Sequence, residues 1–487
     1  MPGVRVHAVA GLLVLTIAAL GFNLPRLAPG ALNWAEPGNV AAALAEGRGF
    51  SDPFAGGTGA TAWVPPLPVW IDAAVFSLAG VKTPAAAKIL LGLAVLGLAA
   101  THALLGTALA PGGAWLRGVA SGLFLAGAVA LPNGPLVVKS EAWLNLLLGV
   151  ALLAAALAHR RRPGRRATVG LIVIAGLAPL ANAGLAFATA VVLLTLAWRD
   201  WRGRSWRAAP YLAALAATLT LGAWTARNAV VLGRIVPLKS NFWFELHLTN
   251  VAAPDGIARG EVVLRELPFF STAAFERYAR LGEIAYVESF RAPALAALKA
   301  DPAHFAANVM RRASRALVYC FVDEGNAPTQ AAFSQADTLK LIQAGELLPL
   351  GGTGRWLWTR LETPPAVAQA RFAALGLADF GTVWADWAEQ RLAYDAERLS
   401  PARLFVGFTT AGAPILALLA AALAGGGRLS REAAWAALIT AALIAPFVLV
   451  NHNPRQQFTL LALQAVVFGA CAQAWVDRRR APATPVA

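Results

Sequence analysis

Residues 141–166 read EAWLNLLLGVALLAAALAHRRRPGRR, an apolar run of helix-forming residues that ends in a cluster of arginines. A membrane-spanning helix needs about 20 predominantly apolar residues, and Lys and Arg gather in the loops on the cytoplasmic side. Long Leu- and Ala-rich runs favour helices over barrel strands, whose side chains would alternate in polarity. This stretch therefore predicts a transmembrane helix that leads into the cytoplasm.

The whole chain has the composition of a membrane protein. Of its 487 residues 58% are hydrophobic and only 14% are charged, whereas soluble chains carry about 25% charged residues. The formal charge is +15, but the basic residues cluster beside apolar runs, as in cytoplasmic loops, so we expect no nucleic-acid partner. The two cysteines, Cys320 and Cys471, do not suggest a disulfide framework.

Eight apolar runs can be threaded through a membrane with every basic cluster on one side. They lie near residues 7–24, 85–109, 114–131, 141–158, 208–226, 403–424, 433–450 and 457–475. The apolar stretch 167–197 has a basic cluster at each end, so a single crossing does not fit it. Pro179 and Asn182 near its middle predict two short helices that form a hairpin. A cleavable signal peptide is the alternative for the first run, but a retained anchor suits the family resemblance given below.

The threading divides the chain into three parts. Residues 1–227 form an N-terminal transmembrane module with a long exterior loop at 25–84, and residues 403–487 form a C-terminal module of three helices. Between them, residues 228–402 lack a long apolar run and hold most of the 26 acidic residues, so we expect a mainly helical exterior section. The prediction is an all-α polytopic protein of the bacterial inner (plasma) membrane, with both termini cytoplasmic.

Amphipathic patterns in the exterior section predict helices near residues 275–290 and 302–321. Tryptophan is enriched where proteins meet the membrane surface. Part of this section is therefore expected to rest on the bilayer, through Trp356, Trp358, Trp384 and Trp387.

Two carboxylates at predicted exterior helix ends are candidates for chemistry. Glu36, just beyond the first span, is placed to act as a general base that deprotonates an acceptor hydroxyl. The alternative is that Glu36 stabilises the N-terminus of a short helix around residues 40–44. Glu141 opens the fourth span, where an ionisable group is either functional or simply begins the helix.

Basic side chains at the same predicted face are candidates for binding phosphate. Arg227, followed by Asn228, lies at the outer end of the span 208–226, and a guanidinium matches phosphate geometry; the alternative is an anchor that snorkels to the interface. Arg455, in the short polar loop before the last span, is a second candidate. His247 and His452 are isolated and too few for a metal site, so a structural role is preferred for both.

The sequence contains no phosphate-binding glycine-rich loop, no Cys/His metal spacing and no Ser-His-Asp arrangement. Use of a cytoplasmic nucleotide is therefore unsupported. If the chain is a membrane enzyme that transfers a sugar, the lack of a nucleotide-binding fold means that the activated sugar must come from a lipid carrier.

Several short motifs follow one another in a consistent order and on a consistent side of the membrane. An acidic residue in the first loop precedes A-x-x-L-x-x-G-x-G-F at 41–50 and P-P-L-x-x-W at 65–70. Next come S-E at 140–141, W-x-x-R-N-x-x-x-x-G-R-x-V-P-L at 224–238 and an arginine that begins the last span. Together, over nearly the whole chain, they resemble the polytopic GT-C glycosyltransferases, which include protein O-mannosyltransferases and lipid A aminoarabinose transferases.

The resemblance implies a polyprenyl-phosphate sugar donor, with Glu36 as the base and with Arg227 and Arg455 facing the donor phosphate. It implies no cofactor, and it leaves a divalent metal open because metal dependence varies across the superfamily. Many members carry an Asp-Glu pair where this chain has Ala35 and Glu36. A branch with one glutamate and a G-x-T-A-W stretch, here residues 59–63, is more similar.

The expected function is transfer of a sugar from a polyprenyl-phosphate donor to a hydroxyl of a lipid, glycan or protein acceptor at the exterior face. Glu36 would drive a single displacement with inversion, and substrate would be bound by Arg227, Arg455, Glu141 and Asn228. A flippase or other transporter of lipid-linked sugars is one alternative, and a catalytically inactive scaffold of the same fold is another.

Overall fold

The computed structural model describes residues 36–109, 141–205, 207–253, 271–318 and 431–451, with shorter stretches within 117–124, 256–268, 340–376 and 460–477. Helices dominate this part of the chain. Four are long and apolar enough to cross a membrane, namely Pro84–Gly106, Ala142–Arg161, Ala183–Arg202 and Glu432–Leu449. A helix satisfies its own backbone polar groups, as lipid requires. The chain is thus mainly helical, and its apolar helices suit insertion into a membrane.

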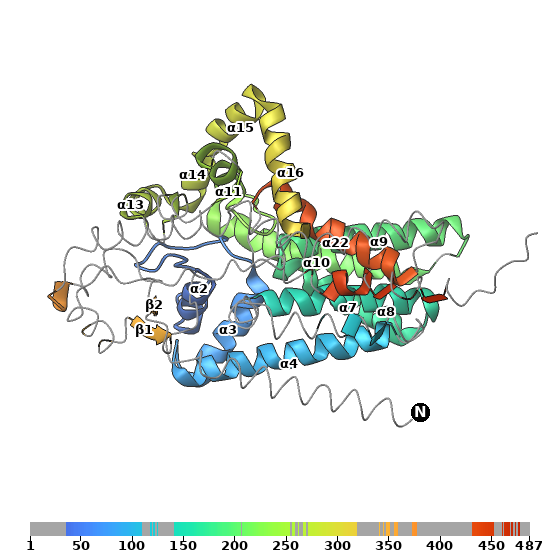
Figure 1. Ribbon diagram of the computed structural model, residues 1–487. Helices are drawn as coiled ribbons and strands as arrows, with labels where there is room; N and C mark the ends of the chain where they lie inside the picture. Colours follow the sequence, from blue (N-terminus) through green and yellow to red (C-terminus); the bar gives the residue numbers. More distant parts are fainter. Residues whose placement is uncertain are drawn as a thin grey trace, which may run out of the picture.

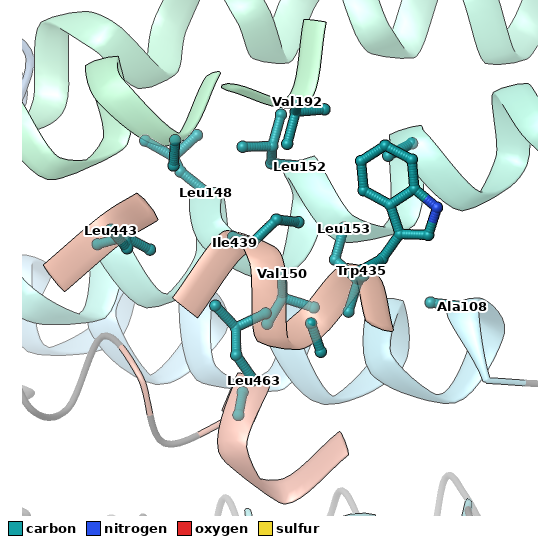
Figure 2. Packing of buried hydrophobic residues seen from close by; sticks show 14 of the residues in the cluster. Ala108, Leu148, Val150, Leu152, Leu153, Val192, Trp435, Ile439, Leu443 and Leu463 are labelled. Carbon is teal, nitrogen blue, oxygen red and sulfur yellow. The ribbon is translucent and has the colours of Figure 1, made fainter. Parts of the chain in front are cut away.

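Long helices pack into a bundle that occupies one side of the molecule (Figure 1). They are α4 (Pro84–Ala108), α7 (Ala142–Arg161), α8 (Arg165–Ala181), α9 (Ala183–Arg202), α10 (Ala208–Leu232) and α22 (Arg431–Leu449). Helix α7 is mostly buried, whereas more than half of the apolar window of α4, α9 and α22 is unburied. Figure 2 shows Leu152 of α7, Val192 of α9 and Ile439 of α22 in the shared core. Helix α7 is therefore the central helix of the bundle.

Four of these helices coincide with predicted spans. Helices α4, α7 and α22 match the runs 85–109, 141–158 and 433–450, and α10 extends the run 208–226 to Leu232. The runs 7–24 and 403–424 lie outside the described residues. Only fragments of the runs 114–131 and 457–475 are described, and those fragments are helical.

The stretch predicted as a hairpin of two short helices does form two helices, but α9 is longer than predicted. Helix α8 has 17 residues and α9 has 20, and α9 is long enough to cross a membrane. The break lies at Asn182, which is extended and whose side chain accepts a hydrogen bond from the Gly184 N–H at 2.8 Å. Pro179 stays inside α8. A proline near a helix end removes only one hydrogen bond, and the asparagine cap then starts the next helix.

Basic residues in the last turn of α7 lie beside the ends of α4, α9 and α22. Arg161 donates from Nη1 to the Ala108 carbonyl at 2.5 Å and pairs with Glu432 at the start of α22. His159 Nε2 lies 3.5 Å from Asp200 Oδ2 near the end of α9. The C-terminal ends of α4, α7 and α9 therefore lie beside the N-terminal end of α22, as the alternation of the spans requires. Which side of a membrane this end faces stays a prediction.

Shorter helices gather at the opposite end (Figure 1). They are α2 (Glu36–Ala45), α3 (Pro66–Ala79), α11 (Phe242–His247), the π-helix η2 (Leu248–Ala252), α13 (Thr272–Leu281), α14 (Glu283–Glu288), α15 (Arg291–Ala300) and α16 (Pro302–Val318). The single helix predicted over 275–290 is in fact α13 and α14, because Gly282, at φ 75°, ends α13. A residue without Cβ adopts this left-handed conformation at little cost.

Two short strands interrupt the section that was predicted to be exterior and mainly helical. Strand β1 (Leu347–Leu350) pairs antiparallel with β2 (Arg355–Trp358), and Trp356 lies opposite Pro349 in the register. Trp384 and Trp387 lie outside the described residues. The prediction that tryptophans of this section rest on the bilayer stays untested.

Helices α9 and α22 pack closely at Gly184, which has no side chain. A Cβ added to Gly184 would lie 2.4 Å from the Leu443 carbonyl oxygen and 2.6 Å from the Phe447 ring. Small residues let membrane helices approach this closely. We expect Gly184→Ala to lower the stability by about 1–3 kcal/mol, because the helices must move apart. Thermal unfolding in detergent would measure the loss. Gly170→Ala is the matched control, since nothing lies within 4 Å of its added Cβ; equal melting of both variants would contradict the prediction.

Candidate functional site

The loop that directly follows α2, which is predicted to be exterior, folds into a defined structure. The Asp52 N–H donates to the Gly59 carbonyl at 2.8 Å, and the Thr61 N–H donates to the Phe50 carbonyl at 3.1 Å, so the chain doubles back on itself. Asp52 has φ 61°, a conformation disfavoured for most side chains. Its carboxylate accepts hydrogen bonds from Arg48 and from the Gly59 N–H, which offsets that strain. The loop thus presents residues 50–63 as a compact unit.

Aromatic side chains join this loop to α11 and α13. Phe54 packs edge-on against Trp63 and against Tyr278 of α13, with ring centroids 5.0 and 4.8 Å apart. Trp63 also lies 5.2 Å from Phe244 of α11. Phe54 and Tyr278 are fully buried. The first loop and residues 240–290 therefore share one hydrophobic core, although they were assigned to different parts of the chain.

Arg227 links the end of α10 to the first loop. Its Nη1 donates to the Thr61 carbonyl at 2.7 Å and its Nη2 to the Phe50 carbonyl at 2.9 Å. The guanidinium also lies over the rings of Phe50 and Trp224, at 5.3 and 5.1 Å from their centroids. These contacts assign Arg227 a role in holding the loop, which neither sequence interpretation included. Binding of a donor phosphate by Arg227 stays a prediction.

Asn228 and Trp224 fold the motif at 224–238 back on itself. The fully buried Asn228 donates from Nδ2 to the Val236 carbonyl at 2.9 Å and accepts from Arg227 through Oδ1 at 3.0 Å. The Trp224 indole N–H donates to the Leu238 carbonyl at 2.9 Å. The turn between them passes through Gly233 at φ 66°. Both ends of the Asn228 amide are thus used in folding this turn, and its predicted contact with substrate stays untested.

Glu283, at the start of α14, holds the other side of the loop. Its Oε1 accepts from the Ala62 N–H at 2.7 Å, and its Oε2 accepts from the Tyr278 hydroxyl at 2.8 Å and from the Thr61 hydroxyl. The Thr61 hydroxyl in turn accepts from the Trp63 N–H at 2.8 Å. Burial raises the pKa of the Glu283 carboxyl, and the hydrogen bonds that it accepts act in the opposite direction. Sequence inspection missed Glu283, because only folding brings it to the loop.

Glu36 stands in the first turn of α2, half-buried. The buried face of α2 is fixed by Asn39, which donates to the Pro53 carbonyl at 3.1 Å and accepts from the Lys82 ammonium at 2.6 Å. A carboxylate in this position interacts favourably with the helix N-terminus. That contact is compatible with a catalytic role, so both interpretations of Glu36 stand.

Glu141 interacts electrostatically with a second carboxylate, Asp72, which the sequence analysis did not single out. Glu141 occupies the N-cap position of α7 without a side-chain cap hydrogen bond. Asp72 lies in α3, a helix of 14 residues that is too short to span a membrane and whose other residues are uncharged. Burial, with a smaller effect from the charge of Glu141, raises the pKa of Asp72 to about 7. The feature of the sequence that could have identified Asp72 is a single aspartate in an otherwise apolar helix.

The raised pKa of Asp72 predicts how stability depends on pH. A carboxyl group whose pKa is higher in the folded state stabilises the fold most below its ordinary value of 3.8, and this contribution is lost as the pH rises to about 7. We expect Asp72→Asn to flatten the stability profile across that range and to be more stable than the wild-type protein at pH 8. Thermal unfolding in detergent from pH 4 to pH 8 measures both effects; parallel profiles would contradict the assignment.

The other residues singled out in the sequence add less to the candidate site. The His247 ring packs against Phe290 with centroids 4.8 Å apart, which fits the structural role preferred for it. Arg455, His452, Cys320 and Cys471 lie outside the described residues. Among the described residues, no group of three or more His, Cys, Asp or Glu side chains is arranged to hold a metal ion.

Comparison with known proteins finds no matching family model, no similar curated protein and no similar solved structure.

Proposed function

We propose that the chain is a membrane glycosyltransferase that moves a sugar from a polyprenyl-phosphate donor to an acceptor hydroxyl at the exterior face of a bacterial inner membrane. One observation carries the proposal. Helix α2, which bears the Glu36 carboxylate, and Arg227 at the end of α10 are both joined to one end of an apolar helix bundle. Arg227 holds the loop that follows α2 through the carbonyls of Phe50 and Thr61. A lipid-linked donor would reach such a site from the bilayer while its acceptor arrives from the aqueous side.

In this mechanism Glu36 takes the proton of the acceptor hydroxyl as its oxygen attacks the anomeric carbon. The bond between that carbon and the phosphate oxygen breaks, the configuration inverts, and polyprenyl phosphate leaves. Arg227 stabilises the charge that develops on the leaving phosphate. The Arg227 guanidinium has five N–H donors. Three of them donate hydrogen bonds to Thr61, Phe50 and Asn228.

A measurement of sugar transfer by the wild-type protein tests the proposal. Proteoliposomes would be supplied with radiolabelled sugars on polyprenyl phosphate or on a nucleotide, and product formation and donor hydrolysis would both be measured. The proposal expects turnover of the polyprenyl-phosphate donor alone. Movement of the labelled lipid across the bilayer without hydrolysis or transfer would favour a transporter. A folded protein that neither moves nor consumes any donor would favour an inactive scaffold.

A further inference from the structure

We propose that Glu283 is a positioning residue of this transferase, which together with Arg227 holds the first loop so that Glu36 stands correctly at the site. The inference rests on the proposed function and adds a residue more than 200 positions away from the base that it serves.

The peptide between Thr61 and Ala62 is held between opposite charges. Arg227 donates to the Thr61 carbonyl at 2.7 Å, while the Glu283 carboxylate accepts from the Thr61 hydroxyl and from the Ala62 N–H. The two charged groups also attract each other electrostatically. Glu283 is 5% exposed, Ala62 is fully buried and Thr61 is fully buried. Hydrogen bonds to a charged group are stronger than neutral ones, so this one peptide is a rigid attachment point.

The attachment continues to α2 through the folded loop. The Phe50 carbonyl accepts from the Thr61 N–H at 3.1 Å and from Arg227 at 2.9 Å. The Arg48 N–H donates to the Ala43 carbonyl within α2 at 2.8 Å. Asn39 of the same helix donates to the Pro53 carbonyl. A displacement of the held peptide would therefore be transmitted to the helix that begins at Glu36.

The chemistry of the network argues for positioning in addition to packing. A buried carboxylate costs free energy that a well-packed apolar side chain of similar volume would avoid. Glu283 instead gathers three donors from Thr61, Ala62 and Tyr278, which fixes the direction of approach of the loop. A misplacement of about 1 Å at a catalytic group can cost about 10²-fold in rate.

The test compares Glu283→Ala and Glu283→Gln in the full chain, with Glu288→Gln as the matched control. Glu288 lies on the same short helix but pairs with Arg234 and Arg291 at the surface. We expect Glu283→Ala to lower kcat about 10²-fold with little change in the KM for donor. Amide exchange over residues 50–63 should become at least about tenfold faster, because charge-assisted hydrogen bonds are lost. Glu283→Gln, which retains an acceptor oxygen, should recover part of both losses.

Two results would overturn the inference in different ways. An active wild-type protein whose Glu283→Ala variant keeps its kcat, or keeps loop protection, would refute positioning and leave the proposed function standing. A loss confined to KM, without recovery in Glu283→Gln, would refute it as well. A wild-type protein that consumes no polyprenyl-phosphate sugar would overturn the proposed function, and the inference would fall with it.

Discussion

Glu36→Gln should reduce sugar transfer from a polyprenyl-phosphate donor by about 10²–10⁴-fold, the contribution typical of a general base. Glutamine keeps the size of the side chain but does not take a proton from the acceptor hydroxyl. The helix that carries it should persist, because α2 is also held by its buried face and by Asn39. Initial rates at saturating donor, in proteoliposomes matched for protein content, would measure the loss.

Glu46→Gln supplies the matched control for this experiment. Glu46 follows the same helix, is exposed and pairs with Arg48 at 2.6 Å. Exposed ion pairs contribute little to stability, so this variant should transfer sugar at the wild-type rate. A Glu36→Gln variant that is equally active would remove Glu36 as the base and direct attention to the Asp72 and Glu141 carboxylates. A loss of folding in Glu36→Gln would instead favour the role of Glu36 at the helix N-terminus.

Arg312→Ala should produce the largest loss of stability. Arg312, of α16, is 1% exposed and donates to the Val448 carbonyl at 2.7 Å, the Leu449 carbonyl at 3.3 Å and the Gly256 carbonyl at 3.0 Å. Burial lowers its pKa only to about 10, so the cation persists at neutral pH. It therefore caps the negative C-terminal end of α22. The hydrogen bond to Gly256 is buried and the two to α22 are partly buried. A hydrogen bond to a charged group contributes about 1.5–3 kcal/mol, so the total loss should reach about 3 kcal/mol or more.

Thermal unfolding in detergent, with limited proteolysis of the exterior helices, would measure the effect of Arg312→Ala. Arg311→Ala is the matched control, because Arg311 is exposed and donates to Asn308 of its own helix at 2.8 Å, so this variant loses a hydrogen bond within α16 but none of the hydrogen bonds to α22. Arg312→Lys should recover part of the loss, since lysine retains the charge but not the three-way geometry of the guanidinium. Equal melting of the Arg311 and Arg312 variants would show that the cap does not hold α16 to the bundle.

The helices were largely predictable, and the errors have local physical causes. Leu- and Ala-rich runs predicted α4, α7 and α22 because long apolar segments and internally satisfied backbones belong together. Pro179 and Asn182 together predicted the break between two helices, but Pro179 is tolerated inside α8 and the Asn182 cap alone divides α8 from α9, which is longer than predicted. The helix expected over 275–290 is divided because Gly282 adopts a left-handed conformation.

The sequence by itself determined that this protein is helical and apolar enough for a membrane, because composition and the length of apolar runs are properties of consecutive residues. It also selected Glu36, Glu141 and Arg227 as candidates by residue type and by their places beside predicted helix ends. Only the tertiary structure decided that Arg227 and Glu283 hold the Thr61–Ala62 peptide from opposite sides. These groups lie more than 160 residues from the peptide that they hold, and no local pattern specifies which distant backbone groups a buried charge will meet.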